Sequence, residues 1–406
     1  MKERQRATRK DSRGRILRKG EGQDKNGRYY FVYTDNQGKR KRIYDTDLIE
    51  LRQAEKDLQK DLEDGINLDA AKRTLNEQFE IYLATKNIRD TTKAEYKSRW
   101  KTHIGKVLGN KRLIDIKKTD VQMFYKQLSD AGMKNSTIHA HSNLLMPTLE
   151  SAVNDDIIRK NPAKNCLKDY NSDVSPQKAL TLEQQENLLN YVDNTPKYAH
   201  YKPFIMFALA TACRKGEIMG LRWEDVDLKN RTISINHQLQ YSKINKKYGF
   251  VLNKPKTQAG QRDIPMTQKC YQALIRQREY QLMLGIDHDR EVCGIKDFIF
   301  TTTTSAPYAP AEINSFLNHI VNAYNQTEQK QAAAEKRECK LLPHISCHTL
   351  RHTACTRLAE SNIDIKVLQQ FMGHSDIRMT MNVYNHVDNV RMRTEIEKAE
   401  KNSRAI

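Results

Sequence analysis

The sequence predicts an α+β protein with three folded parts. These are a small basic three-stranded β-sheet plus one helix, an all-helical part, and a larger, mainly helical part with a small antiparallel sheet. The chain has 406 residues, which is long enough for two or three domains. Its first 45 residues alternate between β-forming runs and turn signals. Beyond them, apolar residues recur with the helical period of about 3.6.

The first part, placed at residues 1–66, is strongly basic. Residues 1–45 carry 15 Lys and Arg against 6 Asp and Glu, so they hold +9 of the formal net charge of +19. Turn signals at Asp24-Lys-Asn-Gly27 and Asp35-Asn-Gln-Gly38 separate the β-forming runs. The expected strands are 15–19, 28–34 and 39–44. A helix capped near Thr46 completes this part.

Double-stranded DNA is the partner expected for this basic sheet. A β-ribbon can enter the major groove, and an excess of Lys and Arg supplies contacts to phosphates. The alternative is a basic arm that only keeps the protein in solution. The residues expected to contact DNA are Arg13, Arg15, Arg18, Lys19, Arg28, Tyr30, Lys39, Arg40, Lys41 and Arg42.

The second part, placed at residues 67–168, is expected to be helical throughout. Four segments begin at good N-capping residues and then place apolar side chains at helical spacing. The expected starts are Thr74, Thr91, Thr119 or Asp120, and Ser136. A polar stretch over 169–180 is expected to link this part to the next.

The third part, placed at residues 181–406, opens at a capping box, Thr181-Leu-Glu-Gln184. An apolar helix over 204–210 and a strand over 232–235 follow. A β-hairpin is expected between 249–252 and 262–266. The stretch 326–338 is expected to be helical or a surface insertion. Residues 390–401 read as a charged helix, which either docks on a neighbouring subunit or lies in solvent.

Several protein classes are excluded by what the sequence lacks. No stretch approaches the ~20 consecutive apolar residues that span a bilayer, and no apolar run follows the basic start. The seven cysteines are odd in number and scattered, which favours reduced thiols over disulfides. We therefore expect a soluble intracellular protein without a membrane partner, whose own partner is a polyanion.

Metal and nucleotide cofactors are not expected. Four possible zinc ligands lie within nine residues: Cys347, His348, His352 and Cys355. Structural zinc sites more often use two separated ligand pairs that close a loop, so we do not assign one here. A phosphate-binding loop for a nucleoside triphosphate and an acidic two-metal cluster are also missing from the sequence.

An ordered set of motifs in the third part resembles the tyrosine recombinases of the phage-integrase family, and closely the integrases of conjugative transposons. Arg214 stands in a Thr-Gly-x-Arg-x-x-Glu pattern that here reads Thr211-Ala-Cys-Arg214 and ends at Glu217. The other matched positions are Lys256 in a hairpin, His348 and Arg351 in His-x-x-Arg, His374 after its glycine, and Tyr384. Ala212 departs from the family's glycine, for which we expect a modest effect at most.

Two of these residue types suit phosphodiester chemistry on their own terms. Planar guanidinium groups can clamp the non-bridging oxygens of a phosphate, a task that we assign to Arg214 and Arg351. Tyr384 is the expected nucleophile, because its phosphotyrosyl ester keeps the bond energy for rejoining. The phenol must be activated, either by the local positive field or by His348 as a base.

The resemblance implies roles for the remaining residues and for the whole chain. Lys256 would protonate the leaving 5′ oxygen, and His374 would donate to a non-bridging oxygen. The implied protein is a site-specific recombinase that integrates and excises a mobile element, a conjugative transposon or a prophage, through a 3′-phosphotyrosine. The implied partners are attachment-site and arm-type DNA, a tetramer of the chain on DNA, an excisionase and host DNA-bending proteins.

Two other functions are open at this point. A topoisomerase that forms a 3′-phosphotyrosine shares the Arg, Lys, His and Tyr chemistry but relaxes supercoils with little sequence preference. A DNA-binding repressor without catalytic activity is the other, although every expected catalytic position is filled. A separate basic sheet and an all-helical part favour site-specific exchange over the topoisomerase.

Overall fold

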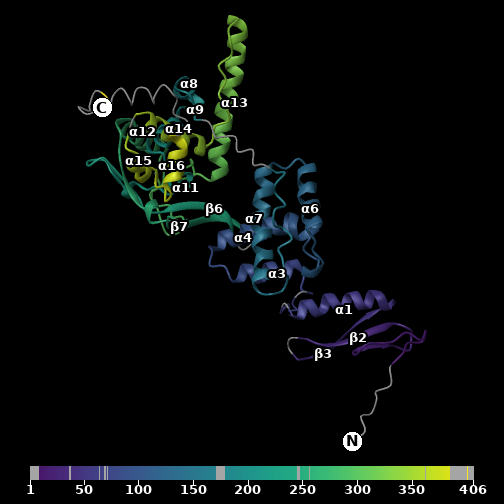
Figure 1. Cartoon of the computed structure of the whole chain (residues 1–406). Helices are drawn as coiled ribbons and strands as arrows, with labels where there is room; N and C mark the ends of the chain where they lie inside the picture. Colours follow the sequence, from purple (N-terminus) through teal and green to yellow (C-terminus); the bar gives the residue numbers. More distant parts are fainter. Residues whose placement is uncertain are drawn as a thin grey trace. The chain divides into compact units, whose positions relative to one another are not determined.

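The computed structural model describes residues 9–35, 38–63, 65–67, 70, 72–170, 179–244, 247–255, 257–361, 363–384 and 400. The chain divides into two compact units, Met1–Ser175 and Pro176–Ile406 (Figure 1). Among the described residues, we find no helix with the length and apolar character needed to cross a lipid bilayer. Residues 390–399, most of the predicted C-terminal helix, lie outside the described part.

The first unit begins with the basic sheet, in the antiparallel order β1-β2-β3. The strands are β1 (Glu21–Gln23), β2 (Tyr29–Thr34) and β3 (Arg40–Asp45), and α1 (Leu48–Glu63) follows. Side chains alternate between the two faces of a strand, so Tyr29 and Phe31 share one face. That face packs on Leu48 and Leu51 of α1 in a small buried core. Figure 1 shows α1 lying over the sheet. The other face of the sheet carries Tyr30.

The first predicted strand was wrong, and the helix cap is one residue later than expected. Within 15–19, only Ile16 forms an isolated bridge, to Lys10. The Asp11 carboxylate instead accepts the backbone N–H groups of Arg13 and Arg15, which folds this stretch into a turn. Asp47, rather than Thr46, caps α1 through the backbone N–H of Ile49.

The four helices expected in the rest of the first unit are present. They are α3 (Leu75–Ala84), α4 (Asp90–Arg99), α6 (Lys118–Asp130) and α7 (Asn135–Asn154). Shorter turns lie between α4 and α6: a π-helical turn at Trp100–Ile104, α5 (Gly105–Val107) and a 3-10 turn at Leu113–Asp115. Thr74 and Glu77 form a capping box at the start of α3. Phe79 stacks on Trp100, with ring centroids 3.9 Å apart, inside one apolar core.

The second unit is mainly helical, as expected. Its helices are α8 (Leu182–Asn194), α9 (Pro196–Ala199), α10 (Lys202–Thr211), α11 (Lys215–Gly220), α12 (Gln268–Leu284), α13 (Pro310–Glu335), α14 (Cys347–Glu360), α15 (Ile365–Met372) and α16 (Ile377–Tyr384). The predicted apolar helix is α10, which packs Phe204 and Phe207 against Phe300 in the core. The capping box at Thr181 is confirmed, and the stretch 326–338 lies largely within α13.

The predicted β-hairpin of this unit was wrong in its pairing. The strands β4 (Val226–Asp227), β5 (Thr232–Ile235) and β8 (Arg262–Pro265) form one antiparallel sheet, whereas β6 (Gln238–Ile244) pairs with β7 (Lys247–Asn253). Strand β8 pairs with β5 because both bury an isoleucine at the same register position, Ile264 opposite Ile233. A 3-10 turn at Gln258–Gly260 leads into β8.

Candidate active site

Three arginines from different segments meet at the C-terminal end of α15. The last carbonyls of a helix have no partner within the helix and carry its negative dipole, so they attract cations. Three successive carbonyls here each accept one guanidinium N–H. The bonds are Arg262 Nε to Phe371 O, Arg351 Nη2 to Met372 O and Arg214 Nη2 to Gly373 O, each 2.7 Å long. We call Arg214, Arg262 and Arg351 the arginine cluster.

Arg214 reaches this cluster from the N-cap of α11. Helix α10 ends at Thr211, and its C-cap Ala212 adopts the left-handed conformation with φ 52°, where glycine is more usual. The chain then turns, and Glu217 accepts both the backbone N–H of Arg214 at 2.8 Å and its Nη1 at 2.9 Å. The Arg214 side chain is 38% exposed. It is therefore held in place and still open to a ligand.

Arg351 lies in the second turn of α14 and is 5% exposed. Its Nη1 donates to the Ala212 carbonyl at 2.5 Å, 139 residues away in the chain. Burial, followed by the charge of Arg214, lowers the pKa of Arg351 to about 10. The guanidinium therefore remains charged at neutral pH, and its donors are fixed before any ligand binds.

His374 follows α15 and contacts the cluster directly. Its Nε2 lies 2.9 Å from Arg351 Nη2, and its Nδ1 lies 3.0 Å from Thr380 Oγ1. A guanidinium only donates, so we assign Nε2 as the acceptor and Nδ1 as the protonated nitrogen. Burial, followed by the charges of Arg351 and Arg214, lowers the pKa of His374 to about 4. This histidine is therefore neutral at pH 7.

His348 lies one turn before Arg351 on the same helix. Ser346 caps that helix, and the His348 side chain is exposed. Partial burial, and then the charges of Arg351 and Arg214, lower the pKa of His348. A neutral, exposed imidazole of this kind can accept a proton.

The possible zinc ligands around His348 are separated by burial. Cys347 and Cys355 lie in the core, and burial raises the pKa of the two thiols to about 12 and about 11. Zinc binds the thiolate, which these surroundings disfavour. In the described part of the chain, no three His, Cys, Asp or Glu side chains are grouped where a metal ion could bind.

The side chains of two predicted catalytic residues lie outside the described part of the chain. Lys256 lies outside the described residues, between β7 and β8. Tyr384 is the last residue of α16, and its side chain lies outside the described part. The structure thus brings together Arg214, Arg351 and His374, with His348 on the same helix as Arg351.

Arg262 was missed by the sequence analysis, which treated it only as part of a strand. A signal was present, because Arg262 and Ile264 are two residues apart and so share a face of β8. Ile264 is fully buried. An arginine on a buried face needs a carboxylate partner, and Glu217 provides it at 3.0 Å.

Some cations of the basic sheet are exposed, and others are held in ion pairs. On the face away from α1, Arg40 and Arg42 are exposed, and Arg42 lies 5.0 Å from the Tyr30 ring. The neighbouring Lys41 alternates to the other face and pairs with Asp35 at 2.9 Å.

The remaining cations that were predicted to contact DNA also divide into ion-paired and exposed residues. Arg15 pairs with the buried Asp11 at 2.8 Å, and Arg28 pairs with Asp24 at 3.0 Å. The exposed remainder comprises Arg13, Arg18, Lys19 and Lys39. The ion-paired cations stabilise turns of the sheet, so they are less available to phosphate than the exposed ones.

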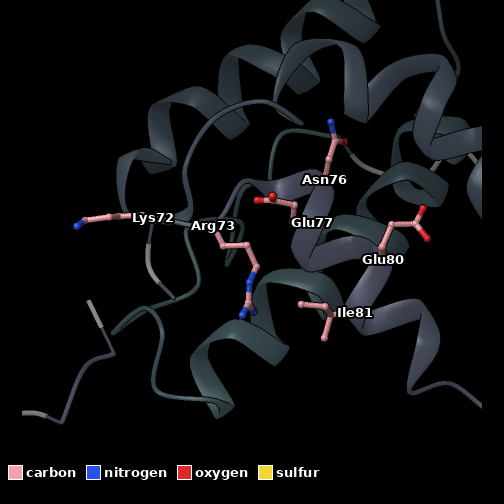
Figure 2. A pocket seen from close by; sticks show the side chains of 6 residues that line it. All are labelled: Lys72, Arg73, Asn76, Glu77, Glu80 and Ile81. Carbon is pink, nitrogen blue, oxygen red and sulfur yellow. The ribbon is translucent and has the colours of Figure 1, made fainter. Parts of the chain in front are cut away.

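A hollow of about 780 Å³ lies in the first unit, on the first turns of α3 (Figure 2). It is lined by Lys72, Arg73, Asn76, Glu77, Glu80 and Ile81. Both signs of charge line it. Glu77 is tied to the helix cap at Thr74, and Glu80 pairs with Lys97. We assign it no function.

Comparison with known proteins gives matches to three families along the chain. Residues 5–62 match the DNA binding domain of tn916 integrase, and residues 74–129 match the N-terminal SAM-like domain of phage integrases. Residues 178–391, which include the arginine cluster, match the phage integrase family.

Individual relatives agree over nearly the whole length. The chain is 32% identical over 395 residues to the transposase from transposon Tn916 of Enterococcus faecalis, covering 93% of each protein. A solved structure of the Tn1549 transposon integrase in complex with transposon right end DNA is 28% identical. It matches with a TM-score of 0.71, over 80% of this chain and 99% of that one.

A more distant structure shares the fold alone. The lambda integrase dimer bound to a core site is 18% identical, with a TM-score of 0.51 over 90% of this chain. The ordered motifs, the arginines that meet at α15 and the length of these matches all agree. This chain belongs to the phage integrase family of tyrosine recombinases.

Proposed function

We propose that the arginine cluster is the phosphate-binding part of the active site, where this recombinase cuts and rejoins DNA through a 3′-phosphotyrosine at Tyr384. The convergence of Arg214 and Arg351 on one helix end carries the proposal. Preorganised donors stabilise charge that develops on a phosphate without reorganising during the reaction. The cluster has three guanidinium groups, and one carboxylate, that of Glu217, is paired with it. Two positive charges of the cluster therefore remain uncompensated.

The proposed step is a transesterification. The Tyr384 phenol oxygen attacks the phosphorus, the bond from phosphorus to the 5′ oxygen breaks, and a bond from phosphorus to tyrosine forms. His348 accepts the phenol proton, and Lys256 protonates the leaving 5′ oxygen. Attack by a 5′ hydroxyl on the phosphotyrosine reverses every step and joins a new strand, so neither ATP nor a metal is required.

His374 has to change partner for its expected role. Its Nε2 accepts from Arg351 in this structure, whereas a donor to a phosphate oxygen needs a proton on Nε2. A phosphate placed on the cluster would draw the Arg351 N–H toward itself. The phosphate's negative charge would also favour the protonated imidazole. We infer that DNA binding converts His374 from acceptor to donor.

The other parts of the chain supply affinity and assembly in this proposal. The open face of the basic sheet, with Arg40, Arg42 and Tyr30, contacts arm-type DNA. Residues 67–168 bind core-site DNA, and residues 181–406 carry out the catalysis. The chain acts in the bacterial cytoplasm on the nucleoid, as a tetramer on DNA, with an excisionase and host DNA-bending proteins. The mass of the complex on attachment-site DNA tests the tetramer.

Covalent capture tests the function without knowledge of the DNA site. The full chain is incubated with nicked fragments of its source DNA and denatured, and the DNA that stays attached is sequenced, with Tyr384→Phe as the control. We expect a few recurrent sequences attached through a 3′ phosphate, and none with the variant. Attachment scattered over all sequences would indicate a topoisomerase. An absence of attachment despite DNA binding would indicate a repressor.

A further inference from the structure

Arg262 is the one member of the arginine cluster that the motif of the family did not point to. We propose that Arg262 is a positioning residue for the recombination reaction, which neutralises Glu217 so that Arg214 keeps its charge for the phosphate, and which holds the turn before His374. The proposal rests on the proposed function of the cluster and concerns a residue without an expected contact to DNA.

The guanidinium of Arg262 donates four hydrogen bonds. The side chain is 7% exposed. Its bonds are Nε to Phe371 O at 2.7 Å, Nη1 to Gly260 O at 3.2 Å, Nη1 to Glu217 Oε1 at 3.3 Å and Nη2 to Glu217 Oε2 at 3.0 Å. The strand β8, the turn before it, α11 and α15 therefore meet at one side chain.

The first consequence is electrostatic. Glu217 is 3% exposed and is shared by Arg214 and Arg262. Burial alone would raise the pKa of Glu217, but hydrogen bonds and charge from Arg262, with those from Arg214, hold it below its usual value. Without Arg262, the buried carboxylate would face Arg214 alone and cancel its charge. The cluster would then hold the phosphate mainly through Arg351.

The second consequence is geometric. Gly373 ends α15 with φ +63°, and a Cβ there would lie 2.8 Å from Arg262 Nη1. The arginine thus packs against the turn that leads into His374. Its bond to the Gly260 carbonyl fixes the 3-10 turn that follows Lys256. Two segments that carry expected catalytic residues are held by the same guanidinium.

Single-turnover cleavage of the nicked duplex captured by the wild-type chain tests the proposal. The variants are Arg262→Gln, Arg262→Lys and the double variant Arg262→Gln with Glu217→Gln. At saturating protein, we expect Arg262→Gln to lower the cleavage rate about 10²-fold, with unchanged Kd for the duplex. Arg262→Lys keeps the charge and retains part of the rate. The double variant removes the uncompensated carboxylate, so it cleaves faster than Arg262→Gln, on the order of tenfold.

A matched control separates positioning from stability. Arg222 pairs with Asp225 at 3.0 Å in the same unit, with side chains 17% and 3% exposed. Arg222→Gln is expected to lower stability without changing the rate per folded molecule. The proposal is overturned if Arg262→Gln cleaves at the wild-type rate, or if the double variant is no faster than the single one. The proposed function itself is overturned if the wild-type chain forms no covalent complex on DNA that it binds. This result concerns the wild-type chain, so it is distinct from any result with the variants.

Discussion

The basic sheet and the arginine cluster carry positive charge in opposite ways. In the sheet, Arg40 and Arg42 are exposed, and Arg42 lies over the Tyr30 ring. In the cluster, the Arg262 side chain is 7% exposed and Arg351 is buried, and both donate to backbone carbonyls. Exposed cations are screened by salt and contribute little each, whereas buried, hydrogen-bonded ones act with fixed geometry. The difference teaches that the sheet is suited to affinity and the cluster to rate.

Loss of the Arg351 side chain should have the largest effect on the cleavage rate. Arg351→Gln is expected to lower the single-turnover cleavage rate by about 10²–10³-fold, because fixed donors to the phosphate are lost. It also leaves the Ala212 and Met372 carbonyls without this donor, so urea denaturation should show a lower free energy of unfolding, by about 1–3 kcal/mol. A variant with the wild-type rate would contradict the assignment of Arg351 to the phosphate.

His374 should make the stability of the second unit depend on pH. Its pKa is about 4 in the folded chain, below the ~6.5 of an unfolded histidine. The unfolded state therefore binds the proton more readily between these values. The stabilisation is present above pH ~6.5 and is lost as the pH falls toward 4, by about 3 kcal/mol at most.

Denaturation at pH 7 and pH 5 checks this prediction. His374→Gln should reduce the loss of stability between the two pH values. His141→Gln is the comparison variant. His141 is a buried histidine of the first unit, and its pKa is also lowered to about 4. An unchanged pH dependence in His374→Gln would show that His374 is not the group that titrates.

Removing the exposed cations of the sheet should weaken binding and spare chemistry. Arg40→Gln with Arg42→Gln is expected to raise Kd for arm-type DNA and to lower the slope of log K against log salt by about 0.9 for each lost phosphate contact. The cleavage rate at saturating protein should not change. Lys41→Gln is the matched control, because Lys41 lies on the other face, paired with Asp35. An equal effect of both changes would contradict the assignment of the open face.

The smallest effect is expected at the turn before Arg214. Ala212 adopts a left-handed conformation that costs an L-residue about 1 kcal/mol. Ala212→Gly should therefore raise the free energy of unfolding by up to about 1 kcal/mol, with little change in cleavage. Gly373→Ala is the opposite change at the left-handed residue that follows α15, and it should destabilise, because its Cβ meets Arg262. Thermal unfolding of both variants checks the signs.

Much of the site could be predicted from motifs, and the missing parts have physical reasons. Arg214, Arg351 and His374 are far apart in sequence, but their residue types and order indicated a common task, and the structure places them together. Arg262 has no motif of that kind, since its role depends on the partner that burial brings to it. Glu217 was noted only as the end of the Arg214 pattern, and its pairing with Arg262 was not expected.

The strands were also predicted better from local patterns than in their pairing. Predicted β-forming runs gave β2, β3 and β5 because alternation is local. The pairing of β8 with β5, and of β6 with β7, depends on which faces the core buries, so adjacency in sequence misled the prediction. The strand expected at 15–19 failed for a local reason, the turn that Asp11 builds through two backbone N–H groups.

One experiment tests the division between rate and affinity most directly. Single-turnover cleavage rate and Kd are measured on the same captured duplex, extended by arm-type DNA, for Arg214→Gln and Arg42→Gln in the full chain. We predict that Arg214→Gln lowers the rate about 10²-fold with an unchanged Kd, and that Arg42→Gln raises Kd with an unchanged rate at saturation. If each variant changed both quantities together, the arginine cluster and the basic sheet would not have separate tasks.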